Sequence, residues 1–128
     1  MEKAPYKRIE LENNHCLDIF DDSRKIAEDA CVVVMTAKME IPVDKSLFVT
    51  EPVTDDLFED ILETLGSPIV YEYRSERNMI MDHEKDEILE GLVNTFLDNM
   101  GQYLSKPRFP EKLVLKEYRE RIDKKNPK

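Results

Sequence analysis

The segment 30–43 constrains the fold more than any other part of the chain. Its odd-numbered positions are all apolar, as in a β-strand with one buried face: Cys31, Val33, Met35, Ala37, Met39, Ile41 and Val43. The opposite face begins with Val32 and Val34 and ends with the polar Thr36, Lys38 and Glu40, so we expect cover on both faces only in its first half. An extended strand of this length spans about 46 Å, whereas a domain of 128 residues is about 36 Å across. The strand must therefore bend, contain a bulge or project.

Two shorter alternating runs precede this strand, at residues 8–11 and 16–20. Asn13 and Asn14 lie between them and predict a hairpin turn, because asparagine tolerates a positive φ. The next segment, 21–25, is rich in short polar side chains that bond their own backbone, and it predicts another turn. The first third of the chain therefore predicts an antiparallel sheet.

After Thr54 the apolar residues recur at a period of 3.6 instead of two, which predicts a helix. Thr54 is the expected N-cap of this helix, and Gly66 is expected to end it. A further strand is predicted over 69–74. Asp82 is then expected to cap a long helix whose apolar positions form one stripe: Ile88, Leu89, Leu92, Val93, Phe96, Leu97, Met100 and Leu104. A last helix is predicted from Phe109. We expect the first two helices to pack their stripes on the sheet.

These elements predict an α+β fold with an antiparallel sheet of about four strands packed with two to three helices. The length fits one domain, 1–128, with 123–128 expected to fray as a basic tail. No secretory signal or membrane-spanning run is found, so we expect a cytoplasmic protein. Cys16 and Cys31 are then expected to be free thiols.

The charge is distributed unevenly along the chain. The whole sequence carries a net charge of −9. Residues 1–100 hold 10 basic and 24 acidic side chains, whereas residues 101–128 hold 9 basic and 4 acidic ones. An acidic body repels phosphates, so we expect no nucleic-acid or membrane partner. The basic C-terminal segment could contact the acidic body or an acidic protein partner.

The sequence predicts no metal, cofactor or catalytic site. His83 and Glu87 stand one helical turn apart, but a zincin helix needs a second histidine at the position of Glu87. The acidic residues between Asp18 and Asp29 lack the glycine of a calcium-binding loop. No nucleophile elbow or phosphate-binding loop occurs. We therefore expect no catalysis, and a small enzyme that uses a divalent cation remains an alternative.

Two groups of residues are candidates for a functional surface. The first contains the polar residues of the expected turn together with a later arginine that could fork onto a carboxylate or phosphate: Asp21, Asp22, Ser23, Arg24 and Arg77. The second is a candidate oligomer interface at Val32 and Val34, because three helices cannot cover both faces of the sheet. The resulting hypothesis is a non-enzymatic binding or regulatory domain that self-associates into a homo-oligomer. An adaptor that binds an acidic partner through the basic C-terminal segment is a further alternative.

The stretch from Leu17 to Asp29 is similar to a segment of a small family of uncharacterised bacterial proteins. Glu76, Arg77 and Asn78 resemble a later landmark of that family, and so do Phe109 and Pro110 with Tyr118. The resemblance implies a bacterial source. It implies no activity, ligand or site residue.

Overall fold

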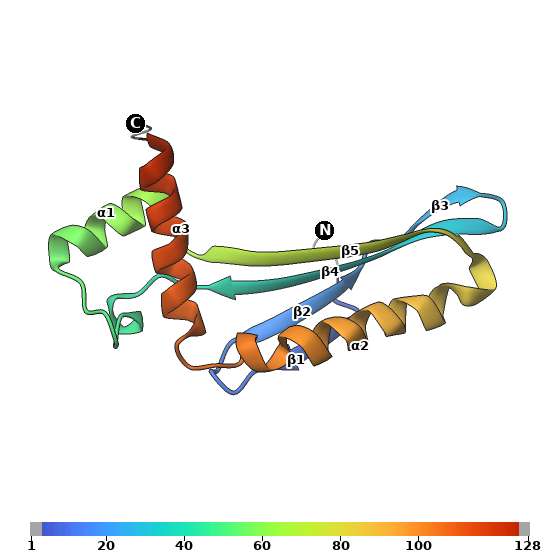
Figure 1. The fold of residues 1–128 in the computed structure, drawn as a ribbon, viewed down its shortest axis with the longest axis horizontal. Helices are drawn as coiled ribbons and strands as arrows, with labels where there is room; N and C mark the ends of the chain where they lie inside the picture. The colour runs from blue at the N-terminus through green and yellow to red at the C-terminus, as the bar shows by residue number, and fades with distance from the viewer. Residues whose placement is uncertain (1–3, 126–128) are drawn as a thin grey trace.

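The computed structural model describes residues 4–125 as a curled antiparallel sheet with three α-helices (Figure 1). The sheet contains β1 (Lys7–Glu10), β2 (Cys16–Asp21), β3 (Arg24–Ala27), β4 (Ala30–Ile41) and β5 (Ile69–Met81). The helices are α1 (Asp55–Leu65), α2 (Lys85–Leu104) and α3 (Phe109–Lys125), with short 3₁₀ turns η1 (Lys45–Leu47) and η2 (Asp82–Glu84). The predicted α+β class is confirmed.

Strand β4 lies at the centre of the sheet. On one edge it pairs with β3 along its first part and with β2 along its second part, and on the other edge it pairs with β5 over almost its whole length. Residues 30–37 are buried, whereas Lys38 and Glu40 are exposed, so the expected change from two covered faces to one is confirmed. The strand ends at Ile41, two residues before the predicted end, because Pro42 cannot donate to a ladder.

The length of β4 is accommodated by a bulge and by an elongated shape. Residues Cys31 and Val33 of β4 face Ile80 and Arg77 of β5, so β5 contains one extra residue there. Figure 1 shows β4 and β5 running from α1 and α3 at one end to the turn after β3 at the other. Strands β4 and β5 therefore extend away from α1 and α3, which lie together at one end of the molecule.

The hairpin between β1 and β2 forms as predicted, with Asn14 at a φ of 68°. The neighbouring Asn13 amide donates to the backbone carbonyls of Leu104 at 2.8 Å and Lys106 at 3.0 Å. This side chain therefore fixes the corner between α2 and α3 against the first hairpin.

The helices occupy two different places. The buried stripe of α2 packs across β4 and β5 through Leu89, Val93 and Phe96. Helix α1 begins at the predicted N-cap, where Thr54 Oγ1 accepts a hydrogen bond from the Leu57 N–H at 3.2 Å. It packs mainly against α3, since the loop after β4 carries it past the end of the sheet (Figure 1). The expectation that both helices pack on the sheet is therefore right for α2 and wrong for α1.

The structure corrects two predicted connections. Residues 21–25 do not form a turn, because Arg24 and Lys25 begin β3. Only Asp22 and Ser23 interrupt the strands, where the Asp22 N–H donates to the Val34 carbonyl at 2.9 Å and Ser23 Oγ accepts from the Val34 N–H at 2.9 Å. These two bonds replace the missing ladder bonds, so the chain passes from β2 to β3 without leaving the edge of β4.

Strand β5 continues to Met81 instead of ending at residue 74, and Asp82 does not cap α2. Asp82 begins η2, and its carboxylate binds the Lys25 ammonium. Helix α3 continues to Lys125, so residues 123–125 of the predicted tail are helical, and residues 126–128 lie outside the described part. No helix in residues 4–125 combines the length and apolar character of a membrane span.

The core under α2 gives a test of this packing. Leu89 is 2% exposed, so Leu89→Ala leaves a cavity between the helix and β4. We expect the free energy of unfolding to fall by about 3 kcal/mol in urea denaturation. The matched change Glu90→Ala, at an exposed position of the same helix, should alter it by less than about 0.5 kcal/mol. Equal effects of the two changes would contradict the orientation of α2.

Candidate functional site: the outer edge of β5

The outer edge of β5 carries unpaired backbone groups at alternate residues. Among the described strands, β5 pairs only with β4. The N–H and C=O of Val34 bond Ser23 and Asp22, so they point away from β5. Val34 faces Glu76, and in an antiparallel ladder such a pair directs the groups of both residues away from each other. The backbone groups of Glu76 therefore point outward.

The same alternation applies along the regular part of β5, from Ile69 to Arg77. The residues whose backbone N–H and C=O point outward are Val70, Glu72, Arg74 and Glu76. Their side chains lie on the sheet face opposite α2, where the Arg74 guanidinium is 3.3 Å from the Glu76 carboxylate. The edge thus combines free hydrogen-bonding groups with a row of alternating charges.

A groove lies between the α2-facing side of β5 and helix α2, with a volume of about 540 Å³. Phe96 forms part of the floor of this groove. The Tyr73 ring stacks on the Phe96 ring, and the two ring centroids are 4.8 Å apart. Polar groups line its rim: Ser75 and Arg77 from β5, and Glu87, Thr95 and Asn99 from α2. A Cβ added at Gly91, which lines the groove, would meet no atom within 4 Å, so there is free space beside Gly91. We call this space the β5–α2 groove.

A second hollow, of about 500 Å³, shares Met100 with the β5–α2 groove and lies beside α3. Phe109 contacts the rings of Tyr71 and Tyr103 edge to face, at centroid distances of 5.8 and 5.2 Å. Burial raises the pKa of the Tyr71 hydroxyl, so the floor stays uncharged at neutral pH. The cationic residues that line this hollow are Lys112, Lys116 and Arg119, and we call it the basic hollow.

The loop before α1 closes the side of the basic hollow. The buried carboxylate of Glu111 accepts hydrogen bonds from the backbone N–H groups of Thr50 at 3.0 Å and Glu51 at 2.8 Å. This contact holds Glu51 beside α3, where its carboxylate lies 3.5 Å from the Arg119 guanidinium. One carboxylate therefore faces three cations, and the hollow keeps a positive charge.

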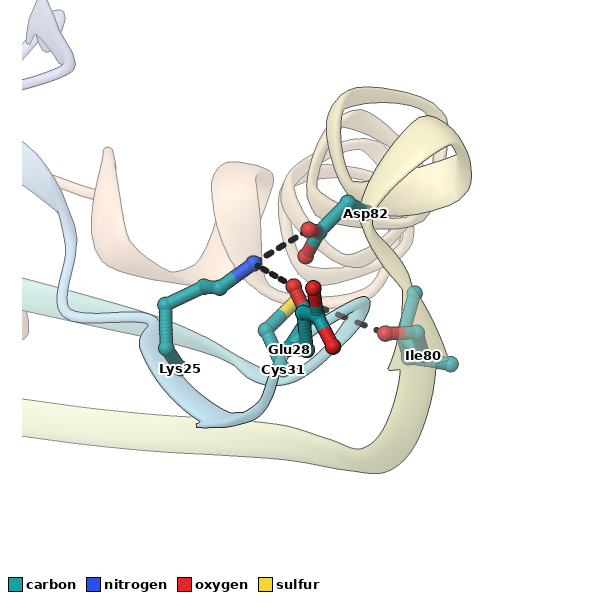
Figure 2. A network of polar contacts seen from close by, with 5 residues as sticks. All are labelled: Lys25, Glu28, Cys31, Ile80 and Asp82. Carbon is teal, nitrogen blue, oxygen red and sulfur yellow. Dashed lines mark hydrogen bonds and ion pairs between the residues drawn. The ribbon is translucent and has the colours of Figure 1, made fainter.

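The opposite end of β5 is held by a polar network (Figure 2). Lys25 Nζ donates to the Glu28 carbonyl at 2.9 Å and to the Asp82 carboxylate, and the Cys31 thiol donates to the Ile80 carbonyl at 3.5 Å. These contacts tie the turn after β3 to the end of β5 and to the start of α2. The exposed acidic side chains of this region, which we call the acidic tip, are Glu28, Asp29, Asp82, Glu84, Asp86 and Glu87.

The predicted surface residues lie in two separate places. Arg77 lines the β5–α2 groove, whereas Asp21, Asp22, Ser23 and Arg24 form the junction of β2 and β3 on the other side of β4. At that junction the Asp21 carboxylate accepts from the Ser23 N–H at 3.0 Å and binds Lys85 Nζ at 3.1 Å. These contacts fix the backbone between β2 and β3 and attach it to the start of α2. The four residues of the junction therefore do not form one site with Arg77.

The other predicted residues are also located. Val32 and Val34 are 4% and 0% exposed in the single chain, so they offer little area to a second molecule, and an interface there stays a prediction. Cys16 and Cys31 are free thiols, as expected. Among residues 4–125, no group of three histidine, cysteine or acidic side chains could hold a metal ion.

Comparison with known proteins finds no match: no protein-family model, no curated protein and no solved structure is similar enough to this chain. The resemblance to bacterial proteins therefore stays an expectation, and the site has to be interpreted from its own geometry. Sequence reasoning missed Glu72, Tyr73 and Arg74 as site residues. The alternation of Tyr71, Tyr73 and Ser75 with charged residues extends past residue 74 and could have indicated the longer strand.

The junction of β2 and α2 predicts a pH dependence of stability. Burial raises the pKa of the Asp21 carboxyl, but hydrogen bonds from Ser23 and Lys85 outweigh this effect and hold it below the ordinary 3.8. An acid with a lowered pKa stabilises the fold above its unfolded-state pKa and loses this contribution as the pH falls through its folded-state pKa. Asp21→Asn should therefore lower the free energy of unfolding at pH 7, and the difference from the parent protein should shrink below pH 3.8. Urea denaturation at both pH values measures this, with Glu90→Gln as the exposed control. A difference that is independent of pH would contradict the contact.

Proposed function

We propose that this chain is a non-catalytic binding domain that receives an extended protein segment as an additional strand along the outer edge of β5. The observation that carries the proposal is the row of outward backbone groups at residues 70, 72, 74 and 76, beside an open groove. An added strand would bond those groups, and every second side chain would enter the groove. Backbone bonds would then supply affinity, and the groove would supply selectivity.

The composition of β5 supports this use. Proteins commonly protect an exposed edge with proline, charged side chains such as lysine, a bulge or a short strand. The strand has 13 residues and contains neither proline nor lysine, and its charges at Glu72, Arg74 and Glu76 alternate in sign, so a partner strand of matching charge is not repelled. Its regular part ends at the bulge near Met79, whose φ is 55°. The edge therefore offers a nine-residue stretch, Ile69–Arg77, that is suited to pairing.

The groove lacks the arrangement expected of a catalytic site. It contains the hydroxyl groups of Ser75 and Thr95, but neither His15 nor His83 lines it, so no imidazole is placed to activate them. The alternative of a cation-dependent enzyme has no group of ligands in the described residues to support it. A binding role accounts for Ser75 and Thr95 as polar contacts for a partner, and it requires neither an imidazole nor a metal ion.

The adaptor hypothesis is supported by the basic hollow. Lys112, Lys116 and Arg119 surround an aromatic floor in which Tyr103 is 47% exposed. An acidic segment with an apolar side chain would match both features. Such a partner would extend the same binding surface, because the hollow and the groove are adjacent at Met100.

Strand addition is tested with peptides selected from a random display library on the immobilised protein. Arg74→Pro removes an outward N–H and should weaken the selected peptides at least about tenfold, as measured by fluorescence anisotropy. Glu10→Pro is the matched control. Leu11 and His15 form a hydrogen-bonded pair, so the Glu10 N–H points outward on the opposite sheet edge, and its loss should change binding by less than about twofold.

Circular dichroism checks that both proline variants keep their strands. Glu72→Pro replaces Arg74→Pro if the latter loses structure, since its N–H also points outward. Failure to select any peptide, or equal losses in the two edge variants, would contradict strand addition at β5.

A further inference from the structure

The β5 edge is complementary to itself. We propose that the segment it receives is β5 of a second copy of this chain, paired antiparallel about a two-fold axis that passes beside Tyr73. This inference rests on the proposed function, because it names the partner of the same edge. A two-fold axis makes any contact between two residues occur twice, so the pattern on one strand decides which registers are favourable.

Backbone geometry and charge together restrict the register. Outward groups meet outward groups only when even-numbered residues face even-numbered residues, which places the axis beside a residue and not between two. An axis beside Arg74 would oppose Arg74 with itself and Glu72 with Glu76, so like charges would meet. Two axes oppose Arg74 with a glutamate: an axis beside Tyr73 opposes it with Glu72, and an axis beside Ser75 opposes it with Glu76.

The bulge in β5 favours the axis at Tyr73. The register with β4 is regular from Ile69 to Arg77 and shifts beyond it, where Met79 adopts a φ of 55°. Tyr73 is the midpoint of this regular stretch, so an axis there pairs residue 70 with 76 and residue 72 with 74 without using the bulge. An axis at Ser75 would place Glu72 against Asn78 inside the distorted part and lose those backbone bonds.

Burial points to the same centre. Tyr73 is 41% exposed although its ring stacks on Phe96, and Val70 is 50% exposed. At an axis beside Tyr73 the two Tyr73 side chains face each other as a pair without direct backbone bonds, the closer type of cross-strand pair. Aromatic side chains in the middle of an interface contribute much of its binding energy. The exposed ring would then be covered in both copies.

Antiparallel pairing also brings the end of β5 in one copy toward the start of β5 in the other. The acidic tip, which includes Asp82 and Glu84, would then approach the end that carries the basic hollow. The acidic side chains of α1 lie at that same end, so the charges along β5 decide the register and the charges of the ends do not.

Cysteine cross-linking tests the register directly. In a Cys16→Ser background, which removes the exposed native thiol, Tyr73→Cys should form a disulfide-linked dimer under mild oxidation. The two Cβ atoms of such a pair are about 5 Å apart, within reach of a disulfide after a small adjustment. Ser75→Cys is the matched control two residues along the same face. It would face Tyr71 of the copy, so the two Ser75 positions are about 13 Å apart and should not cross-link.

Charge exchange gives a second test that does not depend on cysteine chemistry. Arg74→Glu should raise the dimer dissociation constant at least about tenfold in sedimentation equilibrium, because each Glu72 would face a glutamate. The double change Glu72→Arg with Arg74→Glu should restore association. The control double change Arg74→Glu with Glu76→Arg has the same net charge and should remain dissociated. Circular dichroism confirms that each variant is folded.

The outcomes separate this inference from the proposed function. Restoration by the control double change, or cross-linking at Ser75 and not at Tyr73, would overturn the register. A monomer of 15.1 kDa at all micromolar concentrations would overturn the self-pairing. If that monomer still binds selected peptides in a way that Arg74→Pro abolishes, the proposed function stands without this inference. If it binds none, both fail.

Discussion

The pairing of β4 on both of its edges is the constraint on which the rest of the structure depends. Its first eight residues are buried on both faces, and its hydrogen bonds go to β2 and β3 on one side and to β5 on the other. A central strand of this kind fixes the register of its neighbours, because a slip by one residue would turn every apolar side chain to the wrong face. The bonds between Val34 and residues 22 and 23 thereby determine which groups of β5 face outward.

The same constraint produces the candidate site. One helix, α2, covers the face of the sheet along β4 and β5. The β5–α2 groove remains between this helix and β5. Helices α1 and α3 pack on each other at the end of the sheet, where Phe109 of α3 contacts Tyr71 of β5 (Figure 1). Among the described strands, none pairs with the outer side of β5. The polar network of Lys25, Cys31 and Asp82 closes the other end (Figure 2). The proposed strand addition rests on this long edge of β5, which pairs with no other described strand.

The sequence predicted the parts of the fold that are held by burial. The alternation in β4, the N-cap at Thr54 and the stripe of α2 are strong patterns, because one face of each element is in the core. It failed for β3 and for the second half of β5, where most side chains are exposed and pairing with β4 decides the conformation. The strand around Tyr73 and Arg74 was predicted, but its place at the edge of the sheet was not, so these residues were not recognised as a site while Arg77 was identified from its side chain. An edge strand cannot be recognised from one sequence, since its identity depends on what pairs beside it.

Amide hydrogen exchange along β5, followed by NMR at two protein concentrations, tests the central claim most directly. In dilute solution the amides of Glu72, Arg74 and Glu76 should exchange rapidly, while those of Tyr73 and Ser75 should be protected by β4. At a concentration at which the protein associates, the three exposed amides should become protected as well. Uniform protection along β5 in dilute solution would contradict the free edge. Persistent rapid exchange of these three amides in the associated state would show that association does not use this edge.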